Sequence, residues 1–114
     1  MRDLTNLERT VIEGVMRKLP LPDASRLAED LDLAYVDDPA SDSERIRFGI
    51  NGYGRPLYEG QHQYPVEVRL LDSDGAELTA ILYADANDRL YELEVIRWDG
   101  RKLISPDMDS IFFY

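Results

Sequence analysis

Hydrophobic residues recur at helical spacing near the start of the chain. On a helix they form one stripe made of Leu7, Val11, Ile12, Val15, Met16 and Leu19. Just before this stripe, Thr5 and Glu8 have the T-x-x-E spacing of a capping box, in which each side chain accepts from the other residue's backbone N–H. The pattern predicts a helix over about residues 5–19 that packs its apolar stripe on a core.

A shorter segment with the same period follows Pro20 and Pro22. Its apolar positions repeat at i, i+3, i+4 and i+7, as Ala24, Leu27, Ala28 and Leu31. Asp23 stands where its carboxylate can cap the first turn. We therefore expect a second helix over about residues 23–32, a short extended piece over 33–36 and an exposed loop after it.

From residue 45 onward the hydrophobic period changes to two. This alternation predicts strands within residues 45–50, 64–71, 77–84 and 90–98, with a last strand at 101–104 or 110–114. Asp72-Ser73-Asp74-Gly75 and residues 85–88 are tight-turn sequences between consecutive strands, which makes a meander. The sequence predicts a single α+β domain over residues 1–114, with two N-terminal helices packed on one face of a meandering antiparallel β-sheet of about 4–6 strands.

The composition narrows the class of protein. Hydrophobic residues make up 44% and charged residues 32%, which is typical of a globular chain and not of a disordered one. Cysteine is absent, which excludes disulfides, zinc–cysteine sites and thiol catalysis. No apolar run reaches the roughly 18 residues of a membrane span, and the first residues lack the apolar stretch of a signal peptide. We therefore expect a cytoplasmic protein with no membrane contact.

The formal charge of −10 and the pI near 4.4 bear on the choice of partner. Nucleic acids and anionic membranes are bound by cations, so direct binding to either is disfavoured, whereas a basic protein would be attracted. The acids are concentrated in two segments. Residues 23–44 hold eight acids and one base, and residues 72–94 hold seven acids and one base.

Candidate catalytic chemistry rests on carboxylates. Glu92 and Glu94 share one face of their strand, as a general acid–base pair requires, although cross-strand pairing with Arg69 or Arg97 is the structural alternative. His62 is the only histidine and no G-x-S-x-G motif is present, so a serine triad has no local support. The turn at residues 72–75 opens like a calcium loop but lacks its later ligands. We expect no metal and no cofactor.

Several motifs resemble those of a family of small bacterial proteins that carry a domain of unknown function and are similar to immunity proteins of polymorphic toxin and contact-dependent inhibition systems. The motifs are Leu4-Thr5-x-x-Glu8-x-x-x-Ile12, Arg26-Leu27-Ala28, Ala34-x-Val36, Asp72-x-Asp74-Gly75, Ala80-Ile81-Leu82-Tyr83, Arg89-Leu90-Tyr91-Glu92-Leu93-Glu94-Val95 and Asp99-Gly100. Most of these motifs correspond to the start of a helix and to two β-hairpins. The resemblance implies the fold and a toxin partner, and it transfers no catalytic residue.

The charge and the resemblance together predict an acidic protein-binding module. We expect an immunity-type inhibitor, monomeric or weakly dimeric and not an enzyme, that neutralises a basic toxin such as a nuclease. Its partner-binding residues are predicted in the acidic loop and the tyrosine-rich segment after it, as Asp37, Asp38, Asp42, Glu44, Tyr53 and Tyr58. Two alternatives stay open: a small enzyme or ligand-binding domain that uses Glu92 and Glu94, and a soluble domain without a toxin partner.

Overall fold

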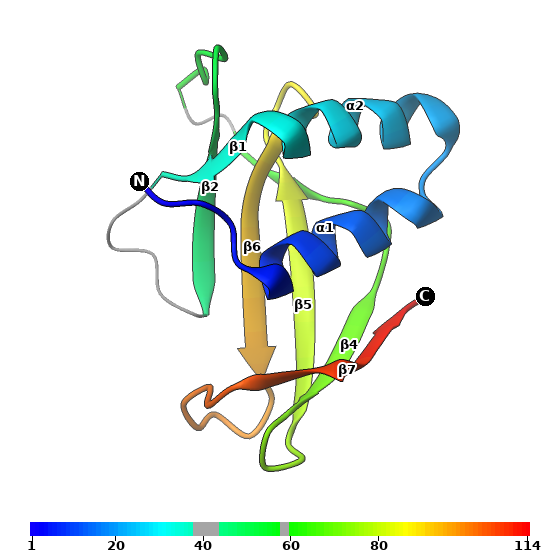
Figure 1. Cartoon of the computed structure of the whole chain (residues 1–114), viewed down its shortest axis with the longest axis vertical. Helices are drawn as coiled ribbons and strands as arrows, with labels where there is room; N and C mark the ends of the chain where they lie inside the picture. Colours follow the sequence, from blue (N-terminus) through cyan, green and yellow to red (C-terminus); the bar gives the residue numbers. More distant parts are fainter. Residues whose placement is uncertain (38–43, 58–59) are drawn as a thin grey trace.

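The computed structural model describes residues 1–37, 44–57 and 60–114. Two helices come first, α1 (Asn6–Lys18) and α2 (Leu21–Leu33). The strands of the described residues follow as β1 (Ala34–Val36), β2 (Arg45–Ile50), β3 (His62–Gln63), β4 (Val68–Asp72), β5 (Glu77–Ala84), β6 (Leu90–Arg97) and β7 (Pro106–Phe113). The predicted α+β class, with N-terminal helices on an antiparallel sheet, is confirmed (Figure 1).

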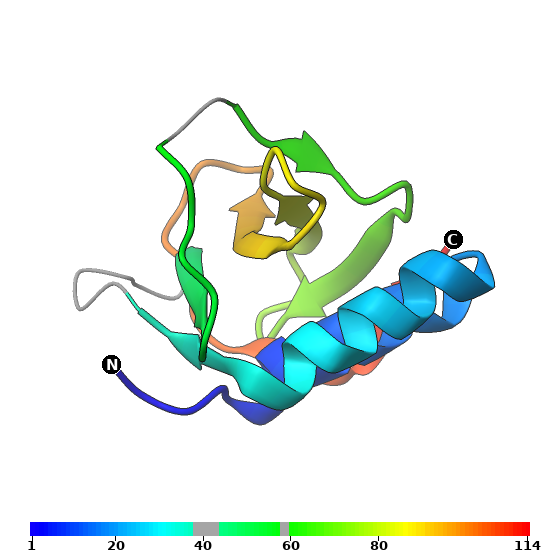
Figure 2. The ribbon, with the colours of Figure 1, turned by 90° about the horizontal axis from the view of Figure 1, so that it is seen from above.

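All strand pairs are antiparallel, and the sheet order is β1-β2-β6-β5-β4-β7, with β3 paired to β5. The strands curl around a common axis, while α1 and α2 lie side by side along one flank (Figure 2). The first helix contacts β5 and β7, and the second contacts β2 and β6. The apolar core therefore fills the space between the helices and the inner face of the curled sheet.

The first helix forms as its sequence predicts. The Glu8 N–H donates to Thr5 Oγ1 at 3.2 Å and the Thr5 N–H donates to Glu8 Oε1 at 2.8 Å, which completes the capping box. Val11, Ile12 and Val15 of the apolar stripe are fully buried. Burying them on the sheet stabilises a helix that its propensity alone would leave marginal.

Gly14 marks the closest approach of α1 to the sheet. A Cβ atom built on Gly14 would lie 1.9 Å from Cζ of Phe113, so no side chain fits between the helix backbone and this ring. Glycine in a helix interior costs about 1 kcal/mol relative to alanine. Here it allows the end of β7 to pack directly on α1.

Some boundaries of the elements differ from the predicted ones. The second helix begins at Leu21, before the predicted Asp23, and its N-cap is Pro20 without a side-chain hydrogen bond. Pro22 fits the first turn because that turn leaves its N–H groups unpaired. Within the predicted strand 64–71 only residues 68–71 are strand, as part of β4, whereas the short β3 pairs with β5. The described sheet has seven strands, and of the two alternatives for the last strand, residues 110–114 overlap β7, whereas residues 101–104 form no strand.

Neither helix of the described residues is long and apolar enough to cross a membrane.

Candidate functional site

The predicted acidic loop is only partly within the described residues. Asp38, Asp42 and Tyr58 lie outside them. Asp37 is exposed, and its N–H donates to the carbonyl of Arg47 at 3.0 Å. Glu44 is also exposed, and one of its carboxylate oxygens accepts from the Leu103 N–H at 3.3 Å. The role of this loop in binding stays a prediction.

Tyr53, predicted as an anchor for a partner, belongs to an internal network. Its hydroxyl donates to Oδ2 of Asp85 at 2.8 Å, and the guanidinium of Arg89 lies over its ring at 4.3 Å. The same Oδ2 accepts from Arg55 Nη1 at 2.7 Å, and Arg89 in turn pairs with Asp30 at 2.7 Å. We call these five residues the Asp85 network. They join α2, the turn after β5 and the segment after β2.

Hydrogen bonds favour the ionised form of Asp85. Burial alone would raise the pKa of Asp85, but hydrogen bonds from the Arg89 backbone and the Tyr53 hydroxyl keep that pKa below its usual value. Asp30 is 1% exposed and accepts from the Leu90 N–H at 3.1 Å as well as from Arg89. These contacts tie Tyr53 to the fold, and its role in binding a partner stays a prediction.

Glu92 and Glu94 lie on the outer face of β6, opposite β2. Glu94 pairs with Arg45 at 2.7 Å, and Glu92 lies 3.3 Å from Arg45 and 3.8 Å from Arg47. The predicted partners Arg69 and Arg97 were wrong: Arg69 lies on β4, which β5 separates from β6, and Arg97 lies on β6 itself and pairs with Asp72, Asp74 and Asp99. The Glu92 side chain is only 2% exposed. These three cross-strand ion pairs favour a structural role over acid–base catalysis for Glu92 and Glu94.

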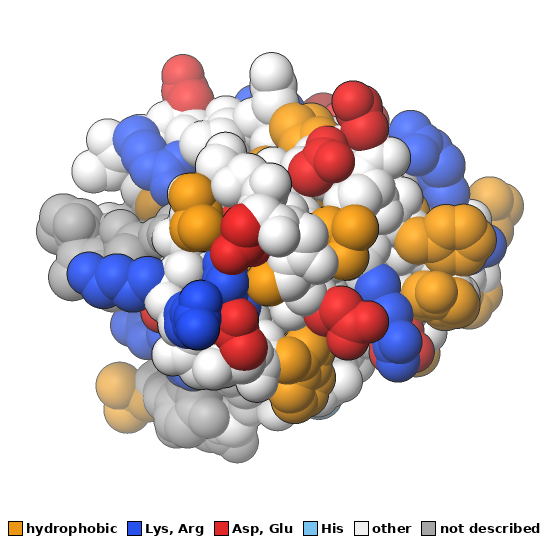
Figure 3. Space-filling model, turned by 90° about the horizontal axis from the view of Figure 1, so that it is seen from below, with side chains coloured by type: hydrophobic (Ala, Val, Ile, Leu, Met, Phe, Trp, Pro, Cys, Tyr) orange, Lys and Arg blue, Asp and Glu red, His pale blue; other side chains and the backbone are white. Residues whose placement is uncertain are grey.

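Arg97 gathers the acids of two turns at one end of the sheet. Its side chain, 4% exposed, pairs with Asp72 at 2.8 Å, Asp74 at 2.7 Å and Asp99 at 2.8 Å. We call this group the Arg97 cluster. Figure 3 looks at the end of the molecule that carries these turns and shows acidic and basic side chains side by side. The acids that resembled a calcium loop are thus neutralised by an arginine of the chain itself.

Hydrogen bonds set the acidity of the Arg97 cluster. Burial alone would raise the pKa of Asp72, but the backbone N–H groups of Ile104, Ser105 and Ser73, together with Arg97, lower it to about 2. Hydrogen bonds from Arg97 likewise lower the pKa of Asp99 to about 2. No group of three or more potential metal ligands occurs among the residues that the structure describes.

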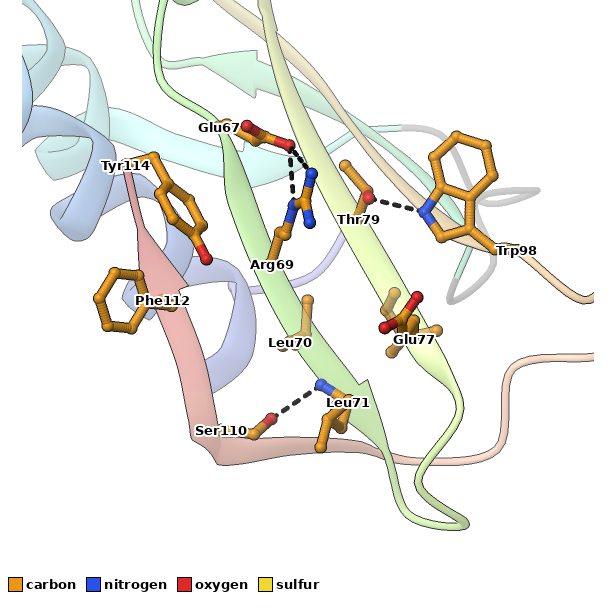
Figure 4. A pocket seen from close by; sticks show the side chains of 11 residues that line it. Glu67, Arg69, Leu70, Leu71, Glu77, Thr79, Trp98, Ser110, Phe112 and Tyr114 are labelled. Atoms are coloured by element: carbon orange, nitrogen blue, oxygen red, sulfur yellow. Dashed lines mark hydrogen bonds and ion pairs between the residues drawn. The ribbon is translucent and has the colours of Figure 1, made fainter.

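A different surface is left open, on the outer face of the sheet across β7, β4 and β5. A groove of about 530 Å³ lies there. Large side chains border it with much of their area exposed: 65% for Trp98, 59% for Phe112 and 59% for Tyr114. In Figure 4, Trp98 stands on one side of the outer-face groove and the two other rings stand on the opposite side. Exposed aromatic residues around one hollow are typical of a binding surface.

The charged side chains in the outer-face groove are Glu77 at the start of β5, Glu67 just before β4 and Arg69 within β4. Glu67 and Arg69 form an ion pair at 2.8 Å, and the Arg69 guanidinium lies 5.7 Å from the centre of the Tyr114 ring. Glu77 lies opposite Trp98, whose backbone N–H donates to the Glu77 carbonyl at 3.3 Å. The Trp98 indole N–H donates to Thr79 Oγ1 at 2.8 Å, which fixes the ring beside β5.

Reasoning from the sequence missed the outer-face groove. Its residues come from four separate places along the chain, and no local motif joins them. One signal was present: the polar positions of the 64–71 and 77–84 segments alternate with apolar ones, and the chain's one tryptophan follows the next strand. Only the strand order brings these positions to one surface.

A comparison with known protein families shows which family the chain belongs to. The family model DUF6984, a domain of unknown function, matches residues 1–107. The chain belongs to DUF6984. No curated protein and no solved structure matches it significantly. The match confirms that the chain carries a domain of unknown function, but it says nothing of toxins, so the likeness to immunity proteins stays a prediction.

The residues matched by the DUF6984 model include one part of the outer-face groove and leave out another. Glu77, Thr79 and Trp98 lie within the matched residues, as do Glu67 and Arg69. Phe112 and Tyr114 lie beyond residue 107. The Trp98 side of the groove is therefore part of the DUF6984 region of this chain.

Proposed function

We propose that this DUF6984 protein is an acidic protein-binding module that neutralises a basic toxin, as immunity proteins do. The observation that carries the proposal is the outer-face groove, in which Trp98, Phe112 and Tyr114 expose large aromatic area around one hollow. Tryptophan, tyrosine and arginine are the residues that most often carry binding energy at protein interfaces. A surface of this kind suits a protein partner better than a small substrate, because it is open.

The charge distribution supports a basic partner. Most arginines are engaged in ion pairs with acids of the chain, at Arg2, Arg17, Arg26, Arg45, Arg47, Arg55, Arg69, Arg89 and Arg97. Other exposed acids have no ion-pair partner in the described part of the chain, among them Asp23, Glu29 and Asp32 on α2. The net charge of −10 is thus expressed at the surface, where it speeds encounter with a basic protein.

Growth rescue tests the proposal. The protein is co-expressed with the product of the neighbouring gene, and we expect that this product is toxic alone, that growth is restored and that the two proteins co-purify. Val15→Asp is the control, since it places a charge at a position that is 0% exposed and should abolish both results by unfolding the chain. Failure of the wild-type protein to restore growth or to co-purify would contradict the proposed function.

The acidic loop and the outer-face groove are competing interfaces for the same partner, and variants separate them. Asp38→Lys with Asp42→Lys reverses two charges of the loop, whereas Trp98→Ala removes the largest exposed ring of the groove. If the groove is the contact surface, Trp98→Ala speeds dissociation of the complex, while the loop variant mainly slows association at low salt. Dissociation that only the loop variant speeds would place the interface at the loop.

A further inference from the structure

The outer-face groove contains two pairs of an aromatic ring and a carboxylate. In the first pair, Tyr114 and Glu67 hold the guanidinium of Arg69 between them: Arg69 Nε donates to Glu67 Oε1 at 2.8 Å, and the cation lies 5.7 Å from the ring centre. Glu67 raises the pKa of Arg69 by this hydrogen bond. An arginine bound by a ring and a carboxylate is therefore part of this surface already.

The second pair is Trp98 and Glu77, between which the described part of the chain places no such cation. The two residues are cross-strand neighbours, joined by the backbone hydrogen bond from Trp98 to Glu77, so their side chains leave the same face of the sheet. Both line the groove, and both are exposed (Figure 4). Within the described residues no arginine, lysine or histidine forms an ion pair with Glu77.

The orientation of the Trp98 indole is fixed by a hydrogen bond within the chain. Its N–H is satisfied by Thr79 Oγ1, so the ring is fixed in place while 65% of the residue stays accessible. A ring whose orientation is already set loses little side-chain entropy when a partner binds. Tryptophan offers the strongest face for a cation among the aromatic side chains.

We propose that Trp98 and Glu77 bind the guanidinium of an arginine side chain from an extended basic segment of the partner protein. This rests on the proposed function and names the chemistry by which the groove would recognise the toxin. Arginine fits better than lysine, because its planar group stacks on an indole and donates two parallel hydrogen bonds to a carboxylate. The charge of Arg69 does not oppose the ligand strongly, since Glu67 neutralises it.

A peptide titration tests the site. The probe is a capped hexapeptide of alternating arginine and threonine, and the matched peptides carry lysine or the neutral isostere citrulline in place of arginine. Because Trp98 is the only tryptophan of the chain, its fluorescence reports on the groove alone. We expect a saturable change with the arginine peptide and binding at least about threefold weaker with the other two. Equal affinity for all three peptides would overturn the assignment.

Matched acid variants separate local contact from general attraction. Glu77→Gln and Glu29→Gln remove one negative charge each, but only Glu77 lines the groove. We expect Glu77→Gln to weaken the arginine peptide about threefold, and Glu29→Gln to weaken it less, since an exposed charge on α2 acts only through a screened field. Equal losses in the two variants would mean that the peptide senses net charge, and the site would be refuted.

Growth rescue distinguishes this inference from the proposed function. Suppose that the wild-type protein neutralises the toxin and that the Trp98→Ala and Glu77→Gln variants neutralise it equally well. The proposed function then stands and the arginine site is wrong. If the wild-type protein neutralises no toxin but binds the arginine peptide through Glu77, the function is wrong and the site stands.

Discussion

The Asp85 network and the outer-face groove are built from the same kinds of side chain. Each contains aromatic rings, arginines and carboxylates. In the network, Arg89 lies over the Tyr53 ring at 4.3 Å and pairs with a carboxylate that is 1% exposed, so ring, cation and acid are all used inside the protein. In the groove, Trp98 and Glu77 stand exposed without a cation from the described residues.

The difference shows how to separate structural from functional polar groups in this protein. A buried carboxylate must be paired, because an unpaired one is costly in the interior, and its partners show that it serves the fold. An exposed ring next to an exposed acid does nothing for the fold that smaller residues could not do. Removing residues from the two regions should therefore have opposite effects on stability and on binding.

Among the polar side chains of the two regions, the largest loss of stability is expected at Asp30. Asp30→Ala leaves the Arg89 guanidinium and the buried Leu90 N–H without their acceptor, and we expect the free energy of unfolding to fall by about 3 kcal/mol. Asp32→Ala is the matched control on the same helix, since Asp32 is exposed and should change stability by less than about 0.5 kcal/mol. Urea denaturation of both variants measures the difference, and similar midpoints would show that the Asp85 network is not essential.

A smaller, pH-dependent effect is expected at the Arg97 cluster. The pKa of Asp72 is lowered from 3.8 to about 2 in the folded protein, so the unfolded chain takes up the proton first as the pH falls. The stability that Asp72 contributes is present above about pH 4 and is lost as the pH falls toward 2. Asp99, with a pKa of about 2, acts in the same direction.

Asp72→Asn removes the titrating group and should make the fall in stability between about pH 4 and pH 2 shallower. The number of protons taken up on unfolding, which sets this slope, should decrease by up to about one. Urea midpoints across this range measure the slope for the wild-type protein and the variant. Asp109→Asn, which removes an exposed carboxylate, controls for the change in net charge. Parallel slopes for wild type and Asp72→Asn would contradict the role of the Arg97 cluster.

Local pattern predicted the elements of the fold well. The capping box at Thr5 and Glu8 and the stripe through Val11, Ile12 and Val15 were found as predicted, because both signals lie within a few residues of each other. The start of α2 was missed since proline at its first turn looks like a helix stop as much as a helix start.

The turn signals predicted the pairing of consecutive strands β4, β5 and β6, but the pairing of strands far apart in the sequence could not be predicted from the same pattern. Alternation says which residues share a face, but not which strand lies beside which, and the pairing of β2 with β6 joins residues 45–47 to residues 92–94. The partners of Glu92 were wrong for this reason. The outer-face groove was missed for the same reason, since Phe112 and Tyr114 reach this face only through the pairing of β7 with β4, which joins Arg69 to Phe112.

The smallest effect on stability is expected in the outer-face groove. Glu77 and Leu78 are consecutive on β5, yet Glu77 points into the groove while Leu78 is 1% exposed in the core. Leu78→Ala should cost about 2–5 kcal/mol through the lost burial and the cavity that it leaves. Glu77→Ala and Trp98→Ala should each cost less than about 1 kcal/mol, since the exposed groups lose little contact and Trp98 gives up only its hydrogen bond to Thr79. Thermal unfolding of the three variants checks this order.

If Trp98→Ala were as damaging as Leu78→Ala, the indole would be holding the sheet together, and its exposure would no longer argue for a partner. If the two groove variants keep the stability of the wild type, any loss of toxin neutralisation that they cause must come from the surface itself.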